Sequence, residues 1–200
     1  MIIDPRFSPA GVLAPKSKAD LAFTMHILSW LAVDGTAAIV EFPGVMYRGG
    51  AEQKIRKYLV DNNFVDAVIQ LPPDLFFGTT IATCILVLKK SKKDNSVLFI
   101  DASGEFVREN TKNKLSTENR VTILEAFEKR ENQEYLSEIV SNEDLANNDY
   151  NLSVSSYVRK EDTKEAVDIA ELNKEIERIV ARQAELRAQI DAIVKDLEDN

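Results

Sequence analysis

Two adjacent phenylalanines, Phe76 and Phe77, are the side chains whose type and position most suggest chemistry in this sequence. They stand between two apolar runs, 65–71 and 81–88, in a connection punctuated by two prolines and a glycine. Apolar side chains normally avoid water, so both rings could tuck back into a core. Alternatively, one ring offers a stacking surface for a flat ligand such as a nucleic-acid base. The residues alone leave both interpretations open.

Other chemistry-bearing residues are sparse. His26 is the sole histidine, and its position on an apolar helical stretch is typical of a packed structural residue. Cys84 is the sole cysteine and falls inside an apolar run, which favours a small buried hydrophobe in a reducing compartment. No carboxylate pair, Ser/His/Asp set or metal-binding cluster stands out. We therefore expect no metal site in this chain.

The two apolar runs beside the phenylalanines are predicted to be strands. Each has strand length, and their near-continuous apolarity is typical of strands covered by helices on both faces. The connection between them is too short for a crossover helix, so the two strands should run antiparallel.

Further elements surround this pair and position it. Upstream, the sequence predicts a helix over 19–31 capped by Ser17, a buried strand over 36–41 and a helix over 51–60. Downstream, the predicted elements are a strand over 97–101, a helix over 118–129 capped by Thr117 or Ser116, a short strand over 135–140 and a helical turn over 142–146 capped by Ser141. This order indicates an α/β fold with at least one parallel crossover.

Charge is distributed unevenly along the 200 residues. The net charge is −8, but residues 161–200 carry twelve acidic and six basic side chains, which leaves residues 1–160 nearly neutral. A domain that grips nucleic acid unaided usually shows a basic excess, which this chain lacks. Its apolar stretches are too short to span a bilayer and no signal peptide opens it, so we expect a cytoplasmic protein without a membrane partner.

The C-terminal residues show the clearest periodicity. Apolar positions with one glutamine alternate at spacings of four and three, which predicts a coiled-coil helix over 169–200. Val180 and Val194 widen the apolar face, so it could equally pack as a hairpin or a bundle. A charged linker over 159–168 separates this helix from the body, 1–158. The predicted partner interface comprises Leu172, Ile176, Ile179, Gln183, Leu186, Ile190, Ile193 and Leu197.

Several short motifs occur along the chain in the same order as in one known family. The chain is similar, over roughly residues 4–158, to the modification (M) subunit of type I restriction–modification systems. The motifs that carry this resemblance are DPRF at 4–7, KADLAF at 18–23, DGTAAIV at 34–40, YRGGAE at 47–52, IR at 55–56, LPPDLFFGT at 71–79, TCILVL at 83–88, LFIDAS at 98–103 and NDYNL at 148–152.

The resemblance implies an adenine-N6 DNA methyltransferase that uses S-adenosylmethionine and whose C-terminal helices contact the specificity (S) subunit. In related adenine methyltransferases a phenylalanine near the corresponding hairpin packs against the extruded base. Phe76 is the first candidate for that role and Phe77 the second. Arg48, Gly49 and Gly50 are a possible phosphate contact, with a simple helix-start turn as the alternative.

Part of the family's catalytic equipment is missing from the sequence. The family's donor site uses a Gly-rich turn after a strand, and catalysis uses an Asn/Asp-Pro-Pro-aromatic loop. Here the sole Pro-Pro, 72–73, follows Leu71 and lacks the required amide or carboxylate. We therefore expect no catalytic or cofactor-binding residue in this chain, and no S-adenosylmethionine bound to it alone. What remains matches the later half of a class I S-adenosylmethionine-dependent methyltransferase-like sheet with flanking helices.

Two functional hypotheses follow. In the first, the chain is a fragment of the M subunit and acts on double-stranded DNA in an assembly with the specificity and restriction (R) subunits. In the second, it is a non-catalytic assembly module that binds a specificity subunit or forms a homodimer through its coiled coil. A Gly-rich strand–turn and an Asn-Pro-Pro-Phe motif in longer upstream sequence would favour the first.

Overall fold

The structure is a computed structural model that describes residues 4–160 and 169–198. The chain divides into two compact units after Lys160, and each is described by itself. Among the described residues, no helix is long and apolar enough to cross a membrane.

A five-stranded mixed sheet forms the centre of the first unit, with strand order β1-β3-β2-β4-β7. Strand β3 runs antiparallel to both of its neighbours, β2 runs parallel to β4, and β7 runs antiparallel to β4. Strands β1, β2 and β4 therefore point the same way, and their carboxyl ends lie at one edge of the sheet. The strands are β1 (Thr36–Glu41), β2 (Val65–Gln70), β3 (Cys84–Lys89), β4 (Ser96–Asp101) and β7 (Ser137–Ser141).

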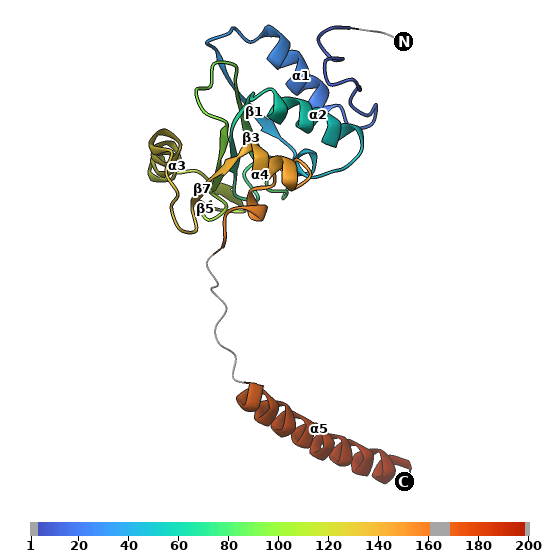
Figure 1. Ribbon diagram of the computed structural model, residues 1–200. Helices are drawn as coiled ribbons and strands as arrows, with labels where there is room; N and C mark the ends of the chain where they lie inside the picture. The colour runs from blue at the N-terminus through green and yellow to red at the C-terminus, as the bar shows by residue number, and fades with distance from the viewer. Residues whose placement is uncertain (1–3, 161–168, 199–200) are drawn as a thin grey trace. The chain divides into compact units, whose positions relative to one another are not determined.

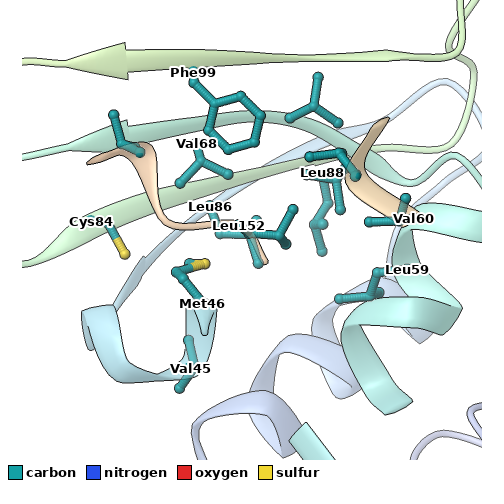
Figure 2. Packing of buried hydrophobic residues seen from close by; sticks show 14 of the residues in the cluster. Val45, Met46, Leu59, Val60, Val68, Cys84, Leu86, Leu88, Phe99 and Leu152 are labelled. Carbon is teal, nitrogen blue, oxygen red and sulfur yellow. The ribbon is translucent and has the colours of Figure 1, made fainter. Parts of the chain in front are cut away.

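Helices cover both faces of this sheet, as Figure 1 shows. Helices α1 (Asp20–Trp30), α2 (Ala51–Asp61) and α4 (Asn142–Asn147) pack on one face, and α3 (Thr117–Lys129) packs on the other. On the first face, alternate side chains of β2, β3 and β4 meet α2 in a continuous apolar cluster. The labelled members in Figure 2 are Val45, Met46, Leu59, Val60, Val68, Cys84, Leu86, Leu88, Phe99 and Leu152.

The opposite residues of the same strands form a second core. Ala67 and Ile69 of β2 and Leu98 of β4 pack in one cluster with Ile123 and Ala126 of α3. The near-continuous apolarity of 65–71 reflects this burial on both faces, because every residue of β2 except the last is buried. The predicted antiparallel pairing of β2 with β3 is confirmed.

Several local predictions are also confirmed. Strand β1 has the predicted bounds, and α2 is one residue longer than predicted. Of the two cap candidates for α3, the structure selects Ser116: its Oγ accepts from Asn119 N at 3.2 Å while Ser116 N donates to Asn119 Oδ1 at 3.0 Å. Ser141 caps α4 through a bond from Asp144 N at 3.0 Å.

Other predictions are wrong at element ends. Ser17 does not cap α1, which begins at Asp20 after Ala19 and has no side-chain cap bond. The strand predicted over 81–88 begins at Cys84, because its pairing with β1 stops at the Glu41–Cys84 pair. The strand predicted from residue 135 begins at Ser137 instead.

The burial predicted for β1 is wrong as well. This strand lies at one edge of the sheet. Thr36, Ala38 and Val40, which point to the face on which α3 packs, are exposed. Helix α3 packs over β2 and β4 on that face, away from β1.

Four short elements have no counterpart in the predictions. A 3-10 turn, η1 (Pro43–Met46), follows β1, and a second one, η2, covers Val154–Ser156. A two-stranded hairpin, β5 (Val107–Glu109) with β6 (Lys112–Lys114), follows β4. The hairpin sequence is polar and lacks the apolar alternation by which strands are usually predicted.

The lone histidine and the lone cysteine both have structural surroundings. The ring of His26 lies 5.8 Å from that of Phe7 and 5.1 Å from that of Trp30, in agreement with a packed residue. Cys84 is buried, and burial raises the pKa of its thiol to about 12, which makes it a poor nucleophile.

The described residues of the second unit form one helix, α5 (Ile169–Glu198). The predicted linker residues 161–168 and the side chain of Leu197 lie outside the described residues. Helicity alone does not distinguish a coiled coil from a hairpin or bundle, so the coiled coil stays a prediction. The remaining predicted interface residues are all exposed: Leu172, Ile176, Ile179, Gln183, Leu186, Ile190 and Ile193.

Candidate functional site

The candidate site is the edge of the sheet where β1, β2 and β4 end. Residues 42–50 follow β1, residues 71–83 follow β2, and the β5–β6 hairpin follows β4. In α/β sheets, ligands bind outside the carboxyl ends of parallel strands, so this edge is where function is expected.

The segment 71–83, called the aromatic loop from here on, carries both phenylalanines. Its base is closed by the bond from Leu71 N to Thr83 O at 2.9 Å, where β2 and β3 separate. Phe77 is fully exposed and Phe76 is 41% exposed, so neither ring is part of the core. Both rings are therefore available to a ligand, and their stacking on a base stays a prediction.

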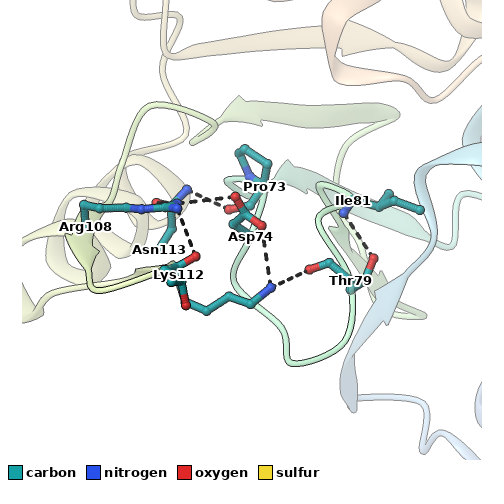
Figure 3. Close-up of polar contacts among 8 residues, drawn as sticks. Pro73, Asp74, Thr79, Ile81, Arg108, Lys112 and Asn113 are labelled. Atoms are coloured by element: carbon teal, nitrogen blue, oxygen red, sulfur yellow. Dashed lines mark hydrogen bonds and ion pairs between the residues drawn. The ribbon is translucent and has the colours of Figure 1, made fainter.

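A charge pair network lies at the foot of the aromatic loop, as Figure 3 shows. Asp74 Oδ2 lies 3.3 Å from Arg108 Nη1, and Asp74 Oδ1 lies 3.5 Å from Lys112 Nζ. Both cations belong to the β5–β6 hairpin. The network joins the loop after β2 to the segment after β4.

The segment 42–50 is organised differently, around the buried guanidinium of Arg56. This side chain donates to the carbonyl oxygens of Val45 at 2.9 Å, Arg48 at 2.7 Å and Tyr150 at 2.8 Å. Burial lowers the pKa of Arg56 to about 10, against an opposing effect from Glu52. Arg56 thereby fixes both the segment after β1 and the loop before η2.

The side chain of Arg48 has partners within the chain. Its Nη1 lies 3.5 Å from Glu52 Oε1, and its guanidinium carbon lies 5.1 Å from the centre of the Phe42 ring. Gly50 stands at the N-cap of α2 with φ +72°, so the backbone of 48–50 forms the helix-start turn. The phosphate contact at Arg48, Gly49 and Gly50 stays a prediction.

A buried carboxyl group ends β1. Glu41 is 4% exposed and accepts a hydrogen bond from Thr24 Oγ1 of α1. Burial raises the pKa of Glu41, and the bond from Thr24 opposes that rise. Its backbone carbonyl faces the Cys84 Sγ at 3.6 Å.

Sequence reasoning missed Glu41, Arg56 and the Asp74 network. One signal was present for Arg56: it stands four residues after Glu52, on the same helical face as the buried Ile55 and Leu59. No comparable signal marks the hairpin residues, because their partners are more than thirty residues away in sequence.

Gly44, the first glycine after β1, does not fit a methyl-donor site. A Cβ placed on Gly44 would lie 2.5 Å from Arg48 Nη2, so the space above this glycine is filled by a side chain of the protein itself. A Gly-rich turn that holds a nucleotide instead leaves its backbone N–H groups open to the ligand. Gly49 and Gly50 are open, with no atom nearer than 4.0 Å to an added Cβ, but they form the turn that starts α2. We assign no described residue to S-adenosylmethionine.

Comparison with known proteins supplies the family. Residues 1–166 match the N-6 DNA Methylase family. The MpnII methylase subunit of a type I restriction enzyme from Mycoplasma pneumoniae is 50% identical over 98% of this chain and 36% of that protein. The MjaVII methylase subunit from Methanocaldococcus jannaschii is 33% identical over 94% of this chain and 33% of that protein.

Solved structures agree with these relatives. A type I methyltransferase subunit from Streptococcus thermophilus shares 45% identity with a TM-score of 0.76, covering 78% of this chain and 33% of its own. The EcoKI M protein shares the fold at 18% identity with a TM-score of 0.60, covering 88% of this chain and 45% of its own. The chain thus spans about a third of the length of the curated relatives above. It belongs to the N-6 DNA methylase family and corresponds to a C-terminal part of the methylase subunit of a type I restriction enzyme.

Proposed function

We propose that this chain provides the target-base side of an adenine-N6 DNA methyltransferase. In the complete subunit, a methyl group passes from S-adenosylmethionine to adenine in double-stranded DNA. The exposure of Phe77, beside the partly exposed Phe76 at the carboxyl edge of the sheet, carries this proposal. Membership of the N-6 DNA methylase family supports the chemistry.

The physical role of an exposed ring follows from the geometry of DNA. A base inside the duplex is out of reach of an enzyme, so it must be extruded at the cost of its stacking. An aromatic side chain that stacks on the extruded base returns part of that free energy, about 1–3 kcal/mol per base. The donor site and the Asn/Asp-Pro-Pro-aromatic loop then belong to the part of the subunit that this chain does not span.

The test is a methylation assay on the full-length methylase subunit assembled with its specificity subunit. Phe76→Ala and Phe77→Ala are made separately, with Phe23→Ala as a matched control, since Phe23 is an exposed phenylalanine on α1. Loss of the stacking ring should lower methylation about tenfold to a hundredfold at an unchanged unfolding midpoint. Methylation as fast in both variants as in Phe23→Ala would show that neither ring stacks on the base.

We further propose that α5 binds the specificity subunit, or a second copy of itself when the chain is alone. The supporting observation is the exposed apolar stripe, which includes Ile179 at 60% and Ile190 at 59%. A helix with such a stripe gains stability when a partner covers it. In the complete type I assembly, the restriction subunit and DNA are the other partners.

Sedimentation of matched double variants tests this interface. Ile179→Asp with Ile190→Asp places two carboxylates in the seam, where an unpaired charge is costly to bury. Ala181→Asp with Ala188→Asp adds the same charge on the opposite side of the heptad pattern and serves as the control. Association should be lost in the first variant and kept in the control. If wild type and both variants are identical monomers and bind the specificity subunit equally, α5 is not an interface.

A further inference from the structure

The backbone of the aromatic loop has weak anchors of its own beyond its base. After the Leu71–Thr83 bond, the next cross-loop bond, from Asp74 N to Thr80 O, is long at 3.4 Å. Asp74 and Gly78 both have positive φ, +59° and +79°, on either side of the two phenylalanines. A loop tip with this backbone needs hydrogen bonds from another element to keep the two phenylalanine rings in a fixed position.

That support comes from Asn113 on β6. Its backbone N donates to Asp74 O at 3.1 Å, and its side-chain Nδ2 donates to Pro73 O at 2.8 Å. The Asn113 side chain is itself held, because its Oδ1 accepts from Arg108 Nη1 at 2.9 Å. Asn113 is 6% exposed, so these bonds are shielded from water. Asn113 thus binds two consecutive carbonyl groups, those of Pro73 and Asp74, on the limb of the loop that precedes the phenylalanines.

The neighbouring residue on β6, Lys112, contacts the limb of the loop that follows the phenylalanines. Its Nζ donates to Thr79 O at 3.0 Å and lies 3.5 Å from Asp74 Oδ1 (Figure 3). Asp74 precedes the phenylalanine pair and Thr79 follows it. A single ammonium group therefore ties together the two limbs between which Phe76 and Phe77 are presented.

These cations are positioned for the loop rather than for a phosphate. Asp74 lies between Arg108 and Lys112, and it offsets part of their charge. Lys114, the other lysine of β6, pairs with Glu109 at 2.9 Å. A hairpin that served as a DNA backbone contact would instead leave its ammonium groups free for phosphate oxygens.

We propose that the β5–β6 hairpin positions the aromatic loop, and that Lys112 and Asn113 are positioning residues for a purine base extruded from DNA. The proposal deepens the proposed function and rests on it for the nature of the ligand. The hairpin holds both limbs of the loop at fixed places, so that the rings meet an incoming base without first having to become ordered.

The first test measures order in the loop and needs no DNA. Backbone ¹⁵N order parameters of residues 76–80 are compared among the wild-type chain, Lys112→Met and Lys114→Met, the last being a lysine of the same strand with a partner outside the loop. A rigid backbone gives about 0.85, and we expect the Lys112 variant to fall below about 0.6 while the control does not change. Lys112→Arg, which retains charge and donors, should restore the order. Unchanged order in Lys112→Met would overturn the proposal.

The second test measures methylation kinetics in the full-length subunit assembled with its specificity subunit. A misplaced loop leaves DNA binding intact but lowers the fraction of correctly held base, so Lys112→Met should reduce kcat about tenfold with little change in KM for DNA. Asn113→Ala should do the same, with a normal unfolding midpoint required for its interpretation. A rise in KM at constant kcat would show a phosphate contact and overturn the proposal. If the wild-type assembly does not methylate DNA, the proposed function fails, and the loop measurement still decides the role of the hairpin.

Discussion

Two loops leave the same edge of the sheet and are built in opposite ways. The segment 42–50 turns inward. Val45 and Met46 are buried, and the buried Arg56 of α2 donates to the carbonyl oxygens of Val45 and Arg48. The aromatic loop turns outward, and two side chains of the β5–β6 hairpin, the partly exposed Lys112 and the buried Asn113, bind its carbonyl groups. Both loops follow strands that run in the same direction, so strand geometry does not explain the difference.

The difference shows where stability and function are separated in this protein. A buried cation with three acceptors holds its loop rigidly, and its removal leaves acceptors without partners. The ion pairs of Asp74 with Arg108 and Lys112 are partly exposed, so they contribute less to stability, and they leave the tip of the aromatic loop accessible to a ligand. We therefore expect substitutions beneath 42–50 to unfold the protein and substitutions in the aromatic loop to leave it folded.

The largest effect is expected from Arg56→Met. Each buried acceptor left unpaired costs about 1–3 kcal/mol, so the free energy of unfolding should fall by about 3 kcal/mol or more. Arg56→Lys should cost less, because one ammonium group can reach some of the three carbonyls. Chemical denaturation measures both losses. Arg120→Met, on the exposed side of α3, is the matched control and should lower the free energy of unfolding by less than about 0.5 kcal/mol. A loss below 1 kcal/mol in Arg56→Met would remove the contrast between the loops.

A pH-dependent effect is expected at Glu41, which ends β1 just before the inward loop. Burial raises the pKa of this carboxyl in the folded state, so the folded protein binds more protons than the unfolded one above the ordinary pKa. The contribution of Glu41 to stability is therefore greatest below its ordinary pKa and is lost as the pH rises through the raised value.

Glu41→Gln removes this titration. The unfolding midpoint of the variant should exceed that of the wild type at about pH 7, and the two should converge near pH 4. Thermal unfolding across this range measures the difference between the two proteins, so the other carboxyl groups cancel. A difference that is independent of pH would show that Glu41 titrates normally.

A much smaller effect on stability is expected from Phe77→Ala in this chain. The ring is fully exposed, so its loss should change the free energy of unfolding by less than about 0.5 kcal/mol. Met46→Ala in the inward segment provides the comparison at about 2–5 kcal/mol, since Met46 is buried. Equal losses in the two variants would mean that the aromatic loop also supports the fold.

No effect at all is expected when S-adenosylmethionine is titrated into this chain. Arg48 fills the space over Gly44, and the sequence lacks the Asn/Asp-Pro-Pro-aromatic loop that accompanies a donor site in this family. Isothermal calorimetry should show no one-to-one binding in the micromolar range. Such binding would place the donor site within these residues and contradict the structural role given to 42–50.

Local pattern predicted most of the sheet and its helices. Strand β2 and helix α2 were predictable because burial dictates their apolar spacing directly. The exposure of β1 was not, because it depends on which strand lies at the edge and where α3 packs. The three residues before Cys84 are apolar or β-branched, as is typical of a strand. They belong to the loop because β1 ends at Glu41 and offers them no residue to pair with.

The candidate site was predictable only in part. Adjacent phenylalanines between two prolines and a glycine identified the loop tip from composition alone. The residues that hold the tip were not predictable, since Asn113 and Lys112 are polar residues in a polar segment and act across a large sequence separation. Arg56 was missed because an arginine on an amphipathic helix usually lies on its solvent face.

The strand order β1-β3-β2 also has a consequence for how the chain is synthesised. Strand β1 leaves the ribosome before its neighbour, and Glu41 must wait until its partner Cys84 has been added. At about 5–20 residues per second, this wait lasts on the order of seconds. Meanwhile β2 and β3 can pair as neighbours in sequence. Strand β1 thus has no partner from β3 during that interval, and its TAAIVE segment, with one charge and no proline, is then open to other nascent chains.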